Sequence, residues 1–249
     1  LSAFSLLGLT SQPLSTPQRM ALPSFEESAF VGWGSAGSLG DVDAVPDPEL
    51  GAEALFDLVS FVMLLAAPEP EPRSTRADTG AQVFEAIGCA SCHVPALTGR
   101  LGPVPLYSDL LLHDMGAGLA EDYRTGVASG AEFRTQPLWG VAAAGPHLHD
   151  GRADTLDEAI RWHGGEATAA RDRYLAASAE ERALVITFLE SLGGRSQRSD
   201  GLLTVDDAVP SDGELGAPRT TLSPAERAAF ERGRVAFDRD VRLADGLGP

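Results

Sequence analysis

Hydrophobic residues recur every three or four positions in several separate stretches of the chain, which is the spacing of an amphipathic helix. The first stretch starts at Asp47-Pro48, a good N-cap followed by a proline at the first helical position, and continues to Leu65. Prolines within residues 68–72 end this helix and form a stiff linker. The apolar part is shorter than the roughly 20 residues that a membrane-spanning helix needs, and it contains Asp57. The pattern therefore predicts a core helix and no membrane span.

A second helix is predicted from Asp78, as its N-cap, to Gly88, with Val83, Phe84 and Ile87 on one side. Three later helices open on capping boxes, in which a Ser or Thr and a Glu three residues later satisfy each other's backbone N–H groups. These pairs are Thr155 with Glu158, Ser178 with Glu181, and Ser223 with Glu226.

Gly, Pro and polar residues dominate the segments between these helices. Residues 1–47 are expected to be irregular, residues 99–151 mostly loop, and residues 195–219 a linker. Short helices, long loops and little strand predict a mostly α fold that is organised by a cofactor rather than by a large apolar core. A Gly-x-x-x-Phe spacing occurs on two predicted helices, at 80–84 and 233–237, and indicates a faint internal repeat.

Composition narrows the possible functions. The chain has 249 residues, 43% of them hydrophobic, which suffices for one or two packed domains. Its net charge of −17 disfavours binding to nucleic acid, whose phosphates it would repel. Its 2 cysteines lie three residues apart, whereas a disulfide framework would use more cysteines spread along the chain.

The two cysteines belong to the sequence Cys89-Ala-Ser-Cys92-His93, which is the attachment pattern of a c-type haem. Two thiols at this spacing can add to the two vinyl groups of one haem, and the next residue, His93, is then placed as the proximal iron ligand. A thioredoxin-like motif would instead follow a strand, whereas a helix is predicted here. A structural zinc site would need four ligands, and no second Cys/His pair with suitable spacing is present. One haem c in this chain is therefore expected.

The second axial ligand of that haem is open at this point. Met115 is the leading candidate, since it lies in a Gly-flanked loop where a methionine is atypical of core packing, although methionines also fill gaps. The other candidates are His113, His147, His149 and His163, with Met63 and Met20 more remote.

Four residues have expected roles other than iron ligation, and for two of them, His149 and Trp139, an alternative stays open. His149 is a candidate catalytic acid/base beside the iron, or a structural histidine bonded to a loop carbonyl or a haem propionate. His163 ends a predicted helix, where a cation is favourable. Phe84 is expected to touch the haem. Trp139 is expected to pack against the haem pocket, with electron relay as the weaker alternative.

Four motifs in order, within residues 107–116, 132–140, 148–152 and 162–166, resemble the di-haem oxidoreductase family, often labelled thiol oxidoreductase. That family is similar to the bacterial di-haem cytochrome c peroxidases. The resemblance covers about residues 77–194 and implies cytochrome c-like domains, each with its own haem motif.

The resemblance implies a domain plan with two departures. Residues 1–72 would be the C-terminal part of a first cytochrome c-like domain without a haem motif, and 73–194 the c-type cytochrome domain. A linker at 195–219 would precede 220–249, the truncated start of a further such domain. Only one haem motif is present, so a second haem is expected in the full-length protein. Leu148 stands where the related peroxidases have a ligating Met, which favours Met115 as the ligand.

These observations predict the electron-transfer domain of a periplasmic or otherwise extracytoplasmic di-haem oxidoreductase. Its expected partner is a small redox protein or a second haem domain, without nucleic acid or membrane span. One alternative is a peroxidase-like enzyme with an open iron site and His149 as the distal base. Another is a non-catalytic haem-bearing docking module, for which the acidic charge suits a basic partner.

Overall fold

The computed structural model describes residues 52–99, 102–122, 124, 128–197, 207–211 and 213–239, and the structural statements below concern these residues. The chain forms two compact units, one of residues 67–198 and one that joins residues 1–66 to residues 199–249. Each unit is described by itself. The helix start expected at residues 47–48 and the irregular segment 1–47 lie outside the described residues.

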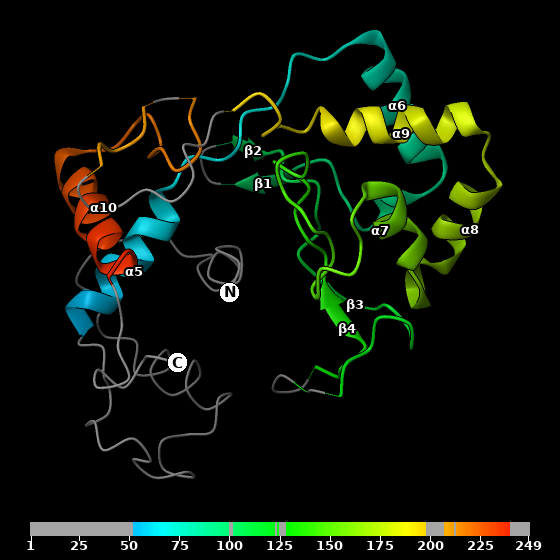
Figure 1. Ribbon diagram of the computed structural model, residues 1–249, viewed down its shortest axis with the longest axis horizontal. Coiled ribbons are helices and arrows are strands. Elements are labelled where there is room, and N and C mark those ends of the chain that lie inside the picture. The colour runs from blue at the N-terminus through cyan, green and yellow to red at the C-terminus, as the bar shows by residue number, and fades with distance from the viewer. Residues whose placement is uncertain are drawn as a thin grey trace. The chain divides into compact units, whose positions relative to one another are not determined.

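The unit of residues 67–198, called the central unit below, is helical with two small hairpins, so the prediction of a mostly α fold is confirmed (Figure 1). Both hairpins are antiparallel, and apart from β1 their strands lie within the expected loop region, residues 99–151. The helices are α6 (Thr75–Ala86), α7 (Leu156–Trp162), α8 (Thr168–Ala176) and α9 (Ala179–Glu190). The strands are β1 (Leu97–Gly99), β2 (Gly102–Val104), β3 (Leu112–Asp114) and β4 (Glu132–Arg134).

Helix α6 begins earlier than its sequence predicts. Ser74, and not Asp78, is the N-cap, and its hydroxyl accepts a hydrogen bond from the N–H of Ala77 at 3.2 Å. Asp78 lies in the first turn instead, where its negative charge is favourable beside the helix N-terminus. The predicted end is confirmed, because Gly88 follows the C-cap with a left-handed φ of 93°.

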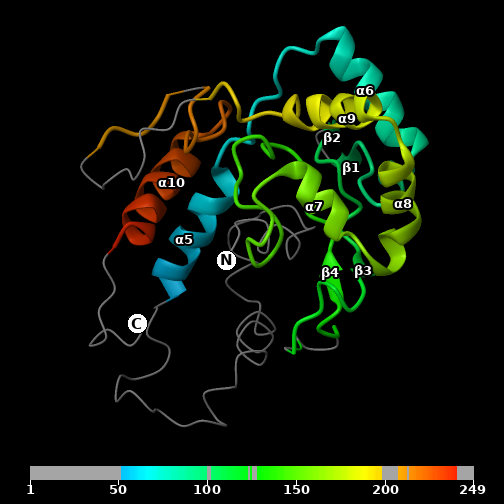
Figure 2. The same cartoon turned by 45° about the vertical axis from the view of Figure 1, so that its right-hand side comes forward.

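A close crossing of α6 and α9 forms the core of this unit (Figures 1 and 2). A Cβ on Gly80 would lie 2.0 Å from the carbonyl oxygen of Leu184 and 2.9 Å from the Cβ of Phe188. Only glycine allows the two helices to approach this far. Phe84, one turn after Gly80, then packs on Phe188 with ring centroids 5.2 Å apart. The buried cluster around this contact also includes Ile87, Tyr174, Val185, Leu189 and Leu192.

The other unit contains a second crossing with the same local contacts. It joins α5 (Ala52–Leu64) to α10 (Pro224–Phe237). A Cβ on Gly233 would lie 2.0 Å from the carbonyl oxygen of Asp57 and 2.6 Å from the Cβ of Phe61. Phe237, one turn after Gly233, packs on Phe61 at 5.3 Å. The faint Gly-x-x-x-Phe repeat thus corresponds to two equivalent helix contacts.

The three predicted capping boxes are confirmed at the N-termini of α7, α9 and α10. Helix α8 was not predicted, since its N-cap, Ala167, makes no side-chain hydrogen bond and gives no start signal. It is held instead by Tyr174, which is fully buried and donates its hydroxyl to Asp157 at 2.7 Å. Among the described residues, no helix has both the length and the apolar character that crossing a membrane requires.

We expect Gly80→Ala to lower the thermal stability of the chain. Alanine favours a helix by about 1 kcal/mol over glycine, but its Cβ would meet a backbone carbonyl that cannot rotate away. The helices must then separate, which costs about 1–3 kcal/mol. Thermal unfolding followed by circular dichroism measures the change. Gln82→Ala, at an exposed position of α6, is the control and should have little effect. A Gly80→Ala variant as stable as the parent would contradict the close crossing.

Candidate haem site

The attachment loop follows α6 directly. After Gly88, a short 3₁₀ turn covers Cys89–Ser91, and the N–H of His93 donates to the carbonyl of Cys89 at 3.0 Å. Both cysteines are free and half-buried. Burial raises the pKa of Cys89 to about 11, and burial together with the charge of Asp109 raises the pKa of Cys92. Both side chains are therefore neutral thiols at pH 7.

His93 is fixed by a residue that the sequence did not reveal. Its Nδ1 donates to the carbonyl oxygen of Tyr107 at 2.9 Å, which leaves the lone pair on Nε2. Burial lowers the pKa of His93 to about 4, so its imidazole is neutral at pH 7. Tyr107 has a left-handed φ of 53°, which costs energy in a non-glycine residue. Its ring packs on Phe188 at 5.5 Å and its hydroxyl accepts from Arg73 at 2.9 Å, and these contacts hold the carbonyl in place.

This donor set fits a c-type haem. Two free thiols three residues apart suit thioether formation, and a neutral imidazole with Nδ1 on a carbonyl is ready to ligate iron. Phe84 is 5% exposed, with its ring centroid 6.3 Å from that of His93. Trp139 lies half-buried in a turn. Direct contact of Phe84 or Trp139 with the haem stays a prediction.

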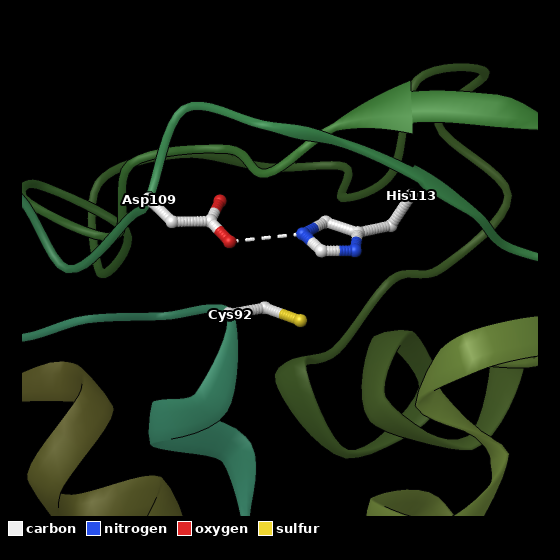
Figure 3. A group of neighbouring side chains, drawn as sticks. All are labelled: Cys92, Asp109 and His113. Atoms are coloured by element: carbon white, nitrogen blue, oxygen red, sulfur yellow. Dashed lines mark hydrogen bonds and ion pairs between the residues drawn. The ribbon is translucent and has the colours of Figure 1, made fainter.

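A polar cluster borders the attachment loop (Figure 3). Ligand atoms of Cys92, Asp109 and His113 lie within 4.8 Å of one another. The N–H of Asp109 donates to the carbonyl of Cys92 at 2.9 Å. His113 uses both ring nitrogens, one on Glu166 and one on Asp109, each at 2.9 Å. We call His113, Asp109 and Glu166 the carboxylate–histidine cluster.

This cluster is an ion-pair network rather than a zinc site. The hydrogen bonds from Glu166 and Asp109 raise the pKa of His113, which favours the protonated imidazolium. A ring with a proton on both nitrogens has no lone pair for a metal. Three potential donors also fall short of the four that a structural zinc site uses. His113 is thereby a poor candidate for the second iron ligand.

The other candidate residues lie on separate loops. The Nε2 of His149 is 3.0 Å from Glu121, and its ring stacks on Phe133 at 4.4 Å. Met115 is half-buried, and its N–H donates to the carbonyl of Ala131 at 2.8 Å. Ligation by Met115 and catalysis by His149 stay predictions.

His147 and His163 are both half-buried, and each has a hydrogen bond that involves the backbone. His147 forms a backbone bridge to Ala153. The Nδ1 of His163 donates to the carbonyl of Ala159 at 2.8 Å, an anchor that the sequence interpretation as a helix-end cation did not include.

Arg173 is a further residue that sequence reasoning missed. Its Nε donates to the carbonyl of Ile87 at 2.8 Å, and its guanidinium fills the space beside Gly88. The positive charge of Arg173 also opposes the burial that raises the pKa of Cys89. Arg173 therefore stabilises the end of α6, next to the thiol of Cys89. No local pattern marks this role, because α8 supplies Arg173 from 86 residues away.

We expect His113→Gln to destabilise the chain most between about pH 5 and 6.5. The raised pKa of His113 means that its contribution is complete below the ordinary histidine value of about 6.5 and is lost as the pH rises through the raised value. The pKa values of Asp109 and Glu166 are lowered, so their share is present above the ordinary carboxyl range of about 4 and is lost in acid.

The measurement is thermal unfolding of the parent and the His113→Gln variant at pH 6 and pH 9. The difference in Tm should be larger at the lower pH. Gln82→Ala, which replaces an exposed, non-titrating residue outside the cluster, is the control and should change Tm equally at both pH values. An equal difference at both pH values would mean that the cluster is not held by ion pairing.

No curated protein sequence matches the chain. A family profile described as "di-haem oxidoreductase, putative peroxidase" matches residues 18–192. This match takes in the attachment loop, the carboxylate–histidine cluster and the helices that position them. The chain belongs to the di-haem oxidoreductase family.

Proposed function

We propose that this chain is the c-type haem electron-transfer domain of a periplasmic di-haem oxidoreductase. The observation that carries the proposal is His93, a neutral imidazole anchored on the Tyr107 carbonyl directly after two free thiols. Covalent attachment through Cys89 and Cys92 would hold the haem, which when bound supplies one-electron chemistry at its iron. The family to which the chain belongs supports a haem oxidoreductase in general.

The protein's own groups would then set the environment of the redox centre. The Tyr107 carbonyl holds the proton of His93 at Nδ1 and makes the imidazole a stronger ligand. Phe84, which packs on Phe188, lies beside His93 and makes this side of the imidazole apolar. A ligand held in this way would keep its geometry between the two oxidation states, as rapid electron transfer requires. The net charge of −17 suits a basic redox partner or a haem domain with a basic face.

A peroxidase-like activity is a second candidate, and one observation favours it. Glu121 lies 3.0 Å from His149, as a carboxylate that orients a catalytic base would. The stacking of His149 on Phe133 fixes the ring further. This function requires an open coordination position on the iron, whereas simple electron transfer does not.

Covalent attachment is tested by extraction. We expect acidified acetone to leave the haem on the protein, and Cys89→Ala or Cys92→Ala to reduce the bound haem because one thioether is lost. Ser91→Ala is the matched control, since it lies exposed between the two thiols and should retain full haem content. Haem that passes into the solvent from the parent protein would overturn the proposed attachment.

Turnover separates the two candidate functions. For an electron carrier, we expect the haem-loaded chain to be reduced and reoxidised reversibly, with no hydrogen peroxide consumed above a haem-only background. His149→Ala should then leave the redox behaviour unchanged. Peroxide consumption that falls by roughly 10²-fold or more in His149→Ala would establish the peroxidase function instead.

A further inference from the structure

The side chain of Ser108 is fully buried, at 0% exposure. A hydroxyl is costly to bury unless it is hydrogen-bonded, and this one is bonded both as donor and as acceptor. Its Oγ donates to the carbonyl oxygen of Thr135 at 2.7 Å and accepts from the N–H of Leu110 at 2.9 Å. The hydroxyl therefore joins its own loop to the residue that follows β4.

The residues on either side of Ser108 turn their backbone groups toward the haem attachment loop. The carbonyl oxygen of Tyr107 accepts from Nδ1 of His93 at 2.9 Å. The N–H of Asp109 donates to the carbonyl oxygen of Cys92 at 2.9 Å. Ser108 thus lies in the middle of a segment that runs along the attachment loop, and its side chain ties this segment to the β3–β4 hairpin.

Two residues of this segment have a backbone conformation that costs energy. Tyr107 has a φ of 53° and Leu110 a φ of 61°, both in the left-handed region that few non-glycine residues occupy. Such conformations persist only where the surrounding contacts enforce them. At Leu110 the enforcing contact is the hydroxyl of Ser108, which accepts the N–H of the residue two positions later. Without this hydroxyl, we expect the segment to relax toward ordinary backbone angles.

Thr135 is a firm anchor for this segment. It is itself buried, at 8% exposure, and its N–H donates to the carbonyl oxygen of Leu111 at 2.9 Å. Thr135 therefore holds the segment twice, through Leu111 and through Ser108. The ring of Tyr107 packs separately on the crossing of α6 and α9. Two different contacts thus hold the Tyr107 carbonyl, one through its own ring and one through the adjacent serine.

We propose that Ser108 is a positioning residue for the proximal histidine of the haem. By holding the backbone after Tyr107, it keeps the carbonyl on Nδ1 of His93 and so leaves the lone pair on Nε2 for the iron. The inference rests on the proposed haem c function and names a residue that tunes it. A strong hydrogen bond at Nδ1 makes the imidazole a better donor to iron, which favours the ferric state and lowers the reduction potential.

The direction of the change in reduction potential separates this role from a loss of packing. In Ser108→Ala, the hydrogen bond from His93 to the Tyr107 carbonyl should weaken, so the ferrous state gains and the potential rises. Water that enters a loosened site would act in the opposite direction. A more polar surrounding favours the ferric haem, which has the greater charge, and lowers the potential.

The test uses the full chain both with and without haem, with its histidines labelled with ¹⁵N. In the haem-free chain, the nitrogen NMR shifts of the His93 ring show which nitrogen holds the proton, and His93→Gln identifies its signals. In the loaded chain, a redox titration measures the reduction potential. The haem-free measurement does not depend on the proposed function.

The variants are Ser108→Ala, Ser108→Cys and the control Ser191→Ala. Cysteine keeps nearly the size of serine but is a weaker hydrogen-bond donor and acceptor, so Ser108→Cys keeps the test decisive if Ser108→Ala does not fold. Ser191 is a matched control, because it is also buried and its hydroxyl donates to the carbonyl oxygen of Phe188 at 2.6 Å. It is the C-cap of α9 and lies outside the segment that binds His93.

We expect the parent His93 to be a single tautomer with its proton on Nδ1. Ser108→Ala should show exchange between the two tautomers and a raised reduction potential. Ser108→Cys should show a smaller change of both in the same direction. Ser191→Ala should lower the Tm but keep the tautomer and the potential of the parent.

Three results would overturn the inference: a parent ring protonated on Nε2, a Ser108→Ala chain with the parent tautomer and potential, or a lowered potential with the parent tautomer. The last would mean that Ser108 only excludes water. Extraction of the haem from the parent by acidified acetone is a different failure. It would overturn the proposed haem c, while the tautomer measurement would still decide whether Ser108 positions His93.

Discussion

The close approach of α6 and α9 at Gly80 is the contact on which the site depends. With a Cβ position only 2.0 Å from the Leu184 carbonyl oxygen, the helices touch backbone to backbone. This contact brings Phe84 onto Phe188. The end of α6, and with it the attachment loop, is thereby fixed relative to α9. Tyr107 packs on the same Phe188 ring, so the same crossing also fixes the carbonyl that orients His93.

The same contact recurs at α5 and α10, which come from opposite ends of the chain. In both crossings a glycine meets a backbone carbonyl, and the phenylalanine one turn after the glycine meets an aromatic residue four positions after that carbonyl. Arg232 adds an ion pair to Asp57 at 2.9 Å in the second crossing. The recurrence gives a physical reason for the repeated Gly-x-x-x-Phe spacing.

Polar contacts, rather than apolar packing, organise the loop side of the site. His113 binds two carboxylates: Asp109, which lies beside Cys92, and Glu166, which follows His163 by three residues. The glycines between His163 and Glu166 allow backbone contact with the loop of His113. The described unit therefore surrounds the attachment loop with two kinds of support. The helix crossing fixes the position of His93, and the carboxylate–histidine cluster fixes the loop that carries Glu166. This division is what a domain with few helices and long loops needs in order to hold a flat, rigid cofactor.

The sequence by itself determined the features that depend on neighbouring residues. The capping boxes of α7, α9 and α10 and the end of α6 at Gly88 were predicted, because each interaction spans at most four residues. The Cys-x-x-Cys-His spacing is likewise local. The start of α6 was placed wrongly at Asp78, since Ser74 and Asp78 are both acceptable near a helix N-terminus and only one is the cap.

Only the tertiary structure decided which distant groups meet. The Tyr107 carbonyl reaches His93 across 14 residues, and Glu166 reaches His113 across 53. These pairings depend on how the loops pack, and no periodicity or cap in the sequence records that. The anchoring of His163 on the carbonyl of Ala159, by contrast, is local, since the two residues lie four positions apart in one helical turn. Local hydrogen bonding thus fixed the elements, and long-range packing fixed the site.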